Sequence, residues 1–127
     1  MNKTVRLELP YPPSVNSYWH ASGKRRYISK AGVQFTKDVA YVVQQASIKG
    51  FADKQVAISV MIHPRSKRKF DLDNTLKAIL DALMKAGMYD DDSQIEYIEI
   101  ARGELVDGGK AVIYLYDYKE EEHGTRQ

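Results

Sequence analysis

The sequence predicts one α/β domain of the α+β kind, a mixed sheet of about four strands covered by two main helices in the order β-α-β-α-β-β. Three observations predict this fold class. Two early segments alternate apolar and polar residues, as half-buried strands do. Two other segments repeat apolar residues every three or four positions, as amphipathic helices do. Two further strand-like segments complete the chain, so the elements are expected at 5–9, 30–49, 56–62, 74–85, 95–102 and 111–118.

Size and composition agree with a single compact domain. The chain has 127 residues, of which 43% are hydrophobic and 28% are charged, and its formal net charge is +2. These values are ordinary for a chain with one core. We place the domain at residues 1–118 and expect a polar, frayed tail at 119–127.

The composition also excludes several classes of protein. The chain has no cysteine, so neither a disulfide framework nor a thiolate metal site is available to it. Residues 1–10 contain no apolar block of the length that a signal peptide needs. No run approaches the roughly 18 apolar residues of a membrane span. We therefore expect a cytoplasmic protein with no membrane partner.

The first half of the chain is predicted to form a strand, an irregular loop and a long helix. Pro10 ends the strand, because proline lacks the N–H that a sheet requires. Residues 11–30 are rich in Pro, Ser, Gly and basic residues, which is typical of a loop. Ser29 is placed to cap the helix and Gly50 to end it. The buried face of this helix is expected to contain Val39, Val43 and Ala46.

The second half is predicted to form a strand, a helix and two further strands. The strand ends near His63, and Gly87 ends the helix that follows. Residues 107–109, Asp-Gly-Gly, are typical of a hairpin turn, which predicts that the last two strands pair. The apolar phase slips between Tyr97 and Ile98, which indicates a β-bulge there. The buried stripe of the helix is expected to contain Leu76, Ile79, Leu80 and Leu83.

Two aspartates, Asp71 and Asp73, lie two residues apart at a junction between a strand and a helix. In extended backbone their side chains point the same way. Two carboxylates held together repel each other, and a bound cation removes that repulsion. Mg²⁺ prefers such oxygen ligands. A structural alternative is that Asp73 only caps the helix.

Lys77 and a second acidic run, Asp90-Asp91-Asp92, favour a site for chemistry. Lys77 lies one helical turn after Asp73, where an ammonium can hold a phosphate or stabilise developing charge. The chain after the helix can return the acidic run towards Asp71, which would supply a third carboxylate to a metal site. The structural alternatives are a solvated pair between Lys77 and Asp81 and a solvated acidic turn.

Two basic segments accompany the acids. The first loop is basic beside aromatic residues, and a second basic run comes immediately before Asp71. Cations interleaved with aromatics suit a phosphate backbone and exposed bases, although such runs are often only solvated loops. Acids alone would repel a polyanion, so flanking cations together with a metal ion are what a nuclease requires. The candidate DNA-binding residues are Lys24, Arg25, Arg26, Arg65, Lys67, Arg68 and Lys69.

Several of these segments match one known pattern. Residues 9–16 read Leu-Pro-Tyr-Pro-Pro-Ser-Val-Asn, and residues 68–74 read Arg-Lys-Phe-Asp-Leu-Asp-Asn. Lys77, Asp81-Ala82-Leu83, Lys85-Ala86-Gly87 and Asp91-Asp92-Ser93-Gln94 follow in the same order. Over roughly residues 5–118 the chain resembles the RusA family of Holliday junction resolvases. The resemblance implies a homodimeric, Mg²⁺-dependent endodeoxyribonuclease of DNA recombination and repair, common in prophages, with Mn²⁺ as an alternative metal.

The resemblance also implies particular roles for residues of this chain. The essential acids and metal ligands of the family fall on Asp71, Asp73 and Asp92, and its essential lysine falls on Lys77. Asn74 matches a position close to the site, and Asp91 matches an additional acid. Asp90 departs from the pattern, because a relative has an apolar residue there. We count Asn16, in the first matching segment, among the DNA-binding residues.

Two other functions remain open at this point. One is a DNA-binding protein without catalysis, whose acids serve as caps and turns. The other is a metal-dependent transferase that uses Asp71 and Asp73 to hold a nucleotide diphosphate. The second requires a nucleotide-binding fold, which a chain of 127 residues without a Gly-rich turn does not favour.

Overall fold

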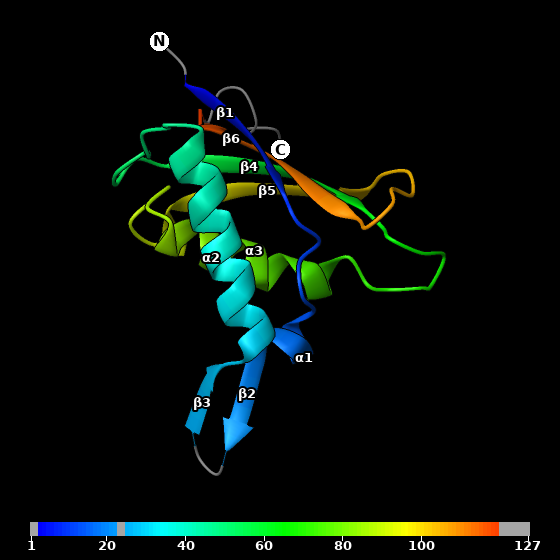
Figure 1. Cartoon of the computed structure of the whole chain (residues 1–127). Coiled ribbons are helices and arrows are strands. Elements are labelled where there is room, and N and C mark those ends of the chain that lie inside the picture. Colours follow the sequence, from blue (N-terminus) through cyan, green and yellow to red (C-terminus); the bar gives the residue numbers. More distant parts are fainter. Residues whose placement is uncertain (1–2, 23–24, 120–127) are drawn as a thin grey trace, which may run out of the picture.

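One mixed sheet organises the chain, and its strands are β1 (Thr4–Leu9), β4 (Val56–His63), β5 (Ile95–Arg102) and β6 (Lys110–Asp117). The computed structural model describes residues 3–22 and 25–119, without the side chains of residues 20–22, 25 and 26. The strands lie in the order β1-β6-β4-β5 (Figure 1). The neighbours β1-β6 and β4-β6 are antiparallel, whereas β4-β5 is parallel.

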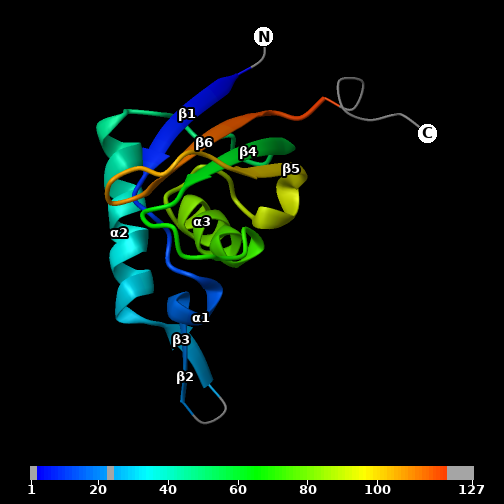
Figure 2. The same ribbon diagram turned by 90° about the vertical axis from the view of Figure 1, so that its right-hand side faces the viewer.

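Two helices, α2 (Lys30–Gln45) and α3 (Asp73–Lys85), cover one face of this sheet (Figures 1 and 2). In β1, every second residue is buried beneath them and the residues between are exposed. Burial of one such apolar side chain contributes about 2 kcal/mol, so this alternation fixes which face each strand turns inward. The largest fully buried side chains of the core are Tyr18, Tyr89, Leu9, Ile58, Ile62, Ile79, Leu83, Met88, Ile113, Leu115, Val39 and Val56.

The predicted fold class is confirmed, and so are several element ends. The side chain of Ser29 caps α2 by accepting a hydrogen bond from the backbone N–H of Gly32 at 3.1 Å. Strand β4 ends at His63, and Gly87 follows α3 with a φ of +87°, which glycine adopts without strain. No helix in the described ranges is long and apolar enough to cross a lipid bilayer. The predicted tail lies outside the description from residue 120 onward.

The expectation of an irregular loop at residues 11–30 is wrong. This segment forms a short helix, α1 (Val15–Tyr18), and a hairpin of β2 (Trp19–Ser22) and β3 (Arg25–Ile28) that projects from the body of the domain (Figure 1). Ser14 caps α1 by accepting a hydrogen bond from the backbone N–H of Ser17. Each element has four residues, which is too short for a hydrophobic period to show in the sequence.

The predicted hairpin between the last two strands is also wrong. Residues 107–109 do form a turn, with positive φ at Gly108 and Gly109, but β5 and β6 flank β4 on opposite sides and do not pair. The connection passes over the end of β4, where the N–H of Gly103 donates to the carbonyl of Ile62 at 2.8 Å. A turn motif reports the local backbone and does not report which strand lies beside which.

Three local expectations also need correction. Helix α2 ends at Gln45, so Gly50 does not end it, and Ala46 is an exposed C-cap and not a core residue. The irregularity in β5 lies beside Val56 and Ala57 of β4, at Glu96, and not between Tyr97 and Ile98. The change of phase in the sequence was real, but the alternation of side chains did not locate the extra residue.

Candidate active site

The acid pair lies at the start of α3. The N-cap position is Leu72, and no side chain caps this helix. The backbone N–H of Asn74 donates to the carbonyl of Asp71 at 3.1 Å, which closes the first turn without a carboxylate. Both Asp71 and Asp73 are exposed, and neither carboxylate forms an ion pair or hydrogen bond within the described part of the chain. The structure therefore excludes the interpretation of Asp73 as a helix cap.

A buried threonine fixes this turn. Thr75 is only 3% exposed, and its hydroxyl donates to the carbonyl of Leu72 at 2.7 Å. This bond lies between the two exposed acids and the buried side of α3. The sequence analysis did not identify Thr75, because a hydroxyl within an apolar helix has several structural roles that only the packing distinguishes.

Lys77 lies one turn further along α3 and is exposed. The expected partner for a solvated pair, Asp81, is already occupied. Its carboxylate forms an ion pair with Lys85 at 3.1 Å and accepts a hydrogen bond from the hydroxyl of Tyr18. Among the described residues, Lys77 has no carboxylate within ion-pair distance, so its ammonium group is available to an external anion.

The acidic run differs from residue to residue. The carboxylate of Asp91 accepts a hydrogen bond from the backbone N–H of Ser93 at 3.0 Å, which caps the short 3₁₀ helix η1 (Asp92–Gln94). Hydrogen bonding with the side chain of Ser93 and, next, with its backbone lowers the pKa of Asp91. Asp90 is exposed, whereas Asp92 is half-buried. The pKa of the buried Tyr89 is raised by burial and, more weakly, by the charges of Asp92 and Asp81. Asp91 therefore turns towards its own backbone, whereas Asp92 lies in η1, which packs against α3.

The structure brings the acids only partly together. Asp71 and Asp73 share the start of α3, and Asp92 lies in η1, which packs against α3. Tyr89, just before the acidic run, donates its hydroxyl to the carbonyl of Leu80 on α3 at 2.7 Å. Among residues 3–22 and 25–119, no three His, Cys, Asp or Glu residues gather closely enough to hold a metal ion. The donor set consists of carboxylates without ion pairs, which fits a hard divalent cation such as Mg²⁺. Its members repel one another, so closer approach requires the cation itself.

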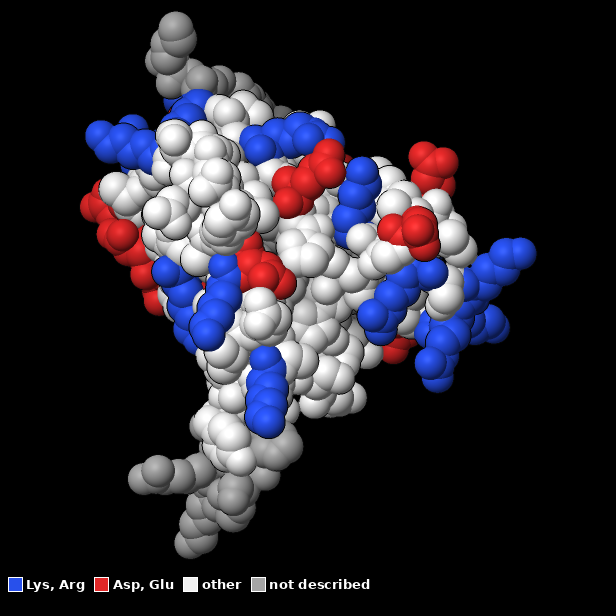
Figure 3. Space-filling model, viewed as in Figure 1, with Lys and Arg blue, Asp and Glu red and all other residues white. Residues whose placement is uncertain are grey.

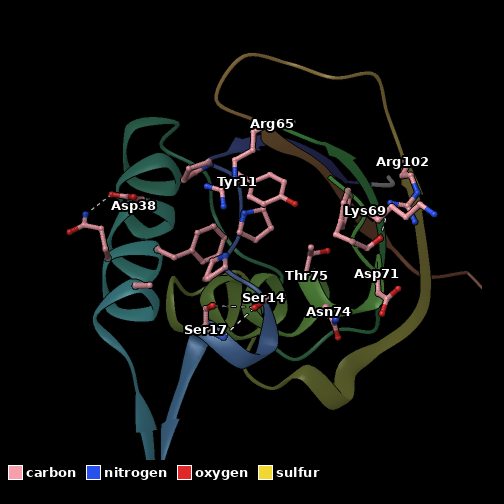
Figure 4. A pocket seen from close by; sticks show the side chains of 17 residues that line it. Tyr11, Ser14, Ser17, Asp38, Arg65, Lys69, Asp71, Asn74, Thr75 and Arg102 are labelled. Atoms are coloured by element: carbon pink, nitrogen blue, oxygen red, sulfur yellow. Dashed lines mark hydrogen bonds between the residues drawn. The ribbon is translucent and has the colours of Figure 1, made fainter. Parts of the chain in front are cut away.

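A hollow of about 1100 Å³ opens beside Asp71 and Asn74. Its walls come from residues 10–14, the first half of α2 and the loop before α3, and Arg102 at the end of β5 contributes a further side (Figure 4). Sequence reasoning missed Tyr11, Phe70 and Arg102. Phe70 had a local indication, since it stands between a basic run and Asp71. Arg102 is 32 residues from Phe70 and had none.

Four of the predicted DNA-binding residues lie in the loop that borders this hollow. Arg65, Lys67, Arg68 and Lys69 are all exposed in the loop between β4 and α3, and cations gather on that side of the molecule (Figure 3). Arg65 and Lys69 line the hollow itself.

The remaining predicted DNA-binding residues lie around the hairpin. Asn16 lines a different hollow of about 870 Å³, beside Trp19 and Tyr27. Arg25 and Arg26 belong to β3, but their side chains are not described, and Lys24 lies outside the described residues.

A metal-assisted nuclease requires acids that can hold a metal ion and cations that can hold the phosphate backbone. This site offers exposed acids, Lys77 one helical turn away and a hollow lined with cations. Comparison with known proteins agrees with this class. A family model described as endodeoxyribonuclease RusA matches residues 10–115. The chain belongs to this family of endodeoxyribonucleases, which confirms the resemblance seen in the sequence.

Individual relatives cover most of the chain. A crossover junction endodeoxyribonuclease rusA from Enterobacteria phage HK97 is 41% identical over 107 residues, which are 84% of this chain and 89% of the relative. A crossover junction endodeoxyribonuclease RusA from Escherichia coli strain K12 is 30% identical over 118 residues, 93% of this chain and 98% of the relative. A relative with the same description from Enterobacteria phage 82 is also 30% identical over 118 residues. The family match, over residues 10–115, thus includes both long helices, β4, β5 and the acidic segments.

Proposed function

We propose that this protein resolves four-way DNA junctions by metal-assisted hydrolysis of phosphodiester bonds, in the cytoplasm and as a homodimer. Membership of the RusA family and the printed descriptions of the relatives, crossover junction endodeoxyribonucleases, support the substrate class. One structural observation carries the assignment of chemistry. The carboxylates of Asp71 and Asp73 are exposed, uncapped and unpaired beside a hollow lined with cations.

In this proposal, Asp71, Asp73 and Asp92 hold Mg²⁺ or Mn²⁺. The bound cation supplies an activated water and offsets the charge on the phosphate under attack. Lys77 stabilises the additional negative charge that develops in the transition state. The loop of residues 65–69 binds the phosphate backbone through exposed cations.

The dimer follows from the symmetry of the substrate. A four-way junction has near two-fold symmetry, so a C₂ dimer presents one site to each of two opposed strands. The face of the sheet that the helices leave open supports this assembly, because Met61 and Tyr114 are 38% and 41% exposed on it. Two nicks placed symmetrically would separate a junction into two duplexes.

The substitution Asp73→Asn tests the proposal. We expect it to lower the rate of junction cleavage by more than about 100-fold, because it replaces a metal ligand and even second-sphere partners cost 10–100-fold. Binding of the junction should persist or tighten, because the substitution removes a charge that repels DNA. The measurement is cleavage of a synthetic four-way junction titrated with Mg²⁺, together with a binding titration.

Asp107→Asn is the matched control. Asp107 is an exposed acid in the turn before β6, where asparagine is equally suited to the backbone. The Asp107→Asn variant should cleave the junction at the normal rate. Normal cleavage by Asp73→Asn would overturn the assignment of the site. Failure of the unsubstituted protein to cleave at any Mg²⁺ or Mn²⁺ concentration would favour a non-catalytic DNA-binding protein.

A further inference from the structure

The hollow beside Asp71 contains an aromatic pair whose rings come from distant parts of the chain. Tyr11 lies between β1 and α1, and Phe70 immediately precedes Asp71. Their ring centroids are 6.2 Å apart and the ring planes are inclined by 78°. Both side chains are only partly buried, although each packs against the edge of the core. The pair thus leaves aromatic surface in the hollow next to a predicted metal ligand.

Guanidinium groups lie against both rings. The Cζ of Arg65 is 4.9 Å from the centroid of Tyr11, and the Cζ of Arg102 is 4.6 Å from the centroid of Phe70. Arg102 also donates to the carbonyl of Phe70 at 3.0 Å, which ties the end of β5 to the loop before α3. Figure 4 shows Tyr11 with Arg65 on one side of the hollow and Arg102 near Asp71 on the other. The result is a set of flat surfaces that also carry positive charge.

The cations of the hollow are available to a ligand. Arg65, Lys69 and Arg102 are exposed, and within the described residues none of them forms an ion pair with a carboxylate. Among the acids that line the hollow, Asp38 accepts a hydrogen bond from the side chain of Gln34 at 2.9 Å. Three cations around two partly exposed rings complement a ligand with a phosphate and a planar base.

The size of the hollow admits such a ligand. Pockets for small molecules have volumes of about 300–1000 Å³, and this hollow of about 1100 Å³ has room for a nucleotide together with its flanking phosphates. A duplex keeps its bases stacked inside, where no ring of the protein reaches them. Unstacked nucleotides, by contrast, stack readily on aromatic rings and guanidinium planes. At the branch point of a junction the continuous stack of a duplex is interrupted, so a base there can be unstacked at a lower cost than within an arm.

We propose that the hollow receives one unstacked nucleotide of the strand being cut, next to the scissile phosphate, with its base against Tyr11 and Phe70. The cations then hold the flanking phosphates while the acids face the bond that breaks. This inference rests on the proposed function and adds a subsite to it. It explains why aromatic rings lie at the mouth of a site whose chemistry requires only charged groups.

Fluorescence of a base analogue tests this subsite without relying on cleavage. A junction carries 2-aminopurine next to the expected cut, or at a distant position in one arm, and binds protein already bearing Asp73→Asn. Stacking on protein should change the emission at the first position and leave the second unchanged. Adding Tyr11→Leu should remove most of the change, whereas Tyr11→Phe, which keeps the ring, should retain it. Equal emission changes for Tyr11→Leu and Tyr11→Phe would overturn the proposal.

An abasic junction provides an arm that does not depend on folding of the variant. Removing the base next to the cut should weaken binding by the protein with an intact Tyr11 by about 10-fold, the usual effect of one stacked base. Removing the base should have little effect on the affinity of the Tyr11→Leu variant for the junction. Tyr41→Leu is the matched control, because Tyr41 is 62% exposed on α2 and does not line the hollow. If the unsubstituted protein cleaves the junction but the abasic site has no effect on binding, the subsite is wrong and the proposed function stands.

Discussion

Three consecutive aspartates, Asp90 to Asp92, differ in what their carboxylates contact. The carboxylate of Asp91 accepts a hydrogen bond from the backbone N–H of Ser93 and so caps η1. Asp92 lies in η1, which packs against α3, and its carboxylate has no hydrogen-bond partner among the described residues. The composition of the run cannot distinguish these roles, because all three residues carry the same group. Their backbone conformations decide which carboxylate remains available to a metal ion.

We expect Asp92→Asn to lower the rate of junction cleavage and Asp91→Asn to leave it nearly unchanged. Asp92→Asn should lower junction cleavage by more than about 100-fold, because it removes a proposed metal ligand. Asp91→Asn should keep cleavage within a few-fold of normal, because asparagine caps a helix as well as aspartate does. The check is a single-turnover cleavage rate for each variant at saturating Mg²⁺. The reverse order of effects would show that Asp91 is the ligand.

At the scale of elements, a buried tyrosine holds α1 against α3. Tyr18 is fully buried, and its hydroxyl donates to the carboxylate of Asp81 and lies 3.4 Å from the hydroxyl of Thr36 on α2. Burial and, next, the hydrogen bond to Asp81 raise the pKa of Tyr18 to about 12. The N-terminal wall of the hollow is thereby joined to the helix that carries the proposed site.

This contact predicts a loss of stability at high pH. A folded-state pKa above the unfolded value of 10.0 gives stability that is complete below pH 10 and lost as the pH rises towards 12. Tyr18→Phe should cost about 1 kcal/mol at pH 8 through the lost hydrogen bond. The substitution should also make the loss of unfolding free energy between pH 10 and 12 smaller. The part that remains comes from Tyr89. Urea unfolding at several pH values measures both effects, and an unchanged pH profile would contradict them, with Tyr41→Phe as the exposed control.

The loop between β4 and α3 makes a second prediction for an element. Alanine at Lys67, Arg68 and Lys69 should weaken junction binding and flatten its dependence on salt, because each lost phosphate contact lowers the slope of log K against log salt by about 0.9. Binding titrations at several salt concentrations give the slope. Alanine at Lys37, Lys49 and Lys54, which are exposed elsewhere, removes the same three charges and controls for net charge. A slope unchanged by the loop variant would show that the loop does not touch DNA.

For the whole molecule, the helices of the described chain cover one face of the sheet. Helices α2 and α3 pack on the inner face, and the outer face is open (Figure 2). Met61 and Tyr114 lie on it in the two central strands, β4 and β6. Exposed apolar residues at the centre of a sheet are typical of an interface. An assembly through this face would leave the hollow, which lies on the helical side, open to DNA.

We expect the protein to sediment at about twice the 14.5 kDa of one chain. Met61→Lys should shift it towards a single chain, because it places a charge in the proposed interface. It should also uncouple the two nicks at a junction. Val33→Lys is the control, since Val33 is 42% exposed on α2 and outside this face. A dimer unaffected by Met61→Lys would place the interface elsewhere.

Several features were predictable from local sequence. The alternation of Val5, Leu7 and Leu9 predicted β1 and its buried face, and Ser29 predicted the start of α2. The spacing of Asp71, Asp73 and Lys77 predicted a metal ion and a phosphate beside one helix, and the three side chains are exposed without ion pairs among the described residues, as that prediction requires. Each of these depends on residues a few positions apart, where backbone geometry leaves few arrangements.

Other features required the folded chain. Residues 107–109 predicted a turn, yet the strands around it are separated by β4, because strand order depends on the packing of the whole sheet. Residues 15–28 form α1 and a hairpin too short to show a period. Arg102 reaches Phe70 only because parallel pairing of β5 with β4 brings the end of β5 to the loop before α3.

The sequence by itself determined the class of chemistry, since the acids, Lys77 and the basic run are patterns of neighbouring residues. Acids alone would repel DNA, so their combination with cations indicates chemistry on a phosphate. The tertiary structure decided which groups are available. It uses Asp91 to cap η1 and pairs Asp81 with Lys85. It leaves Asp73 and Lys77 without an ion pair among the described residues. It also formed a hollow from Tyr11, Phe70 and Arg102. The physical reason is that charge patterns arise between neighbours in sequence, whereas burial and pairing arise between residues that only folding brings into contact.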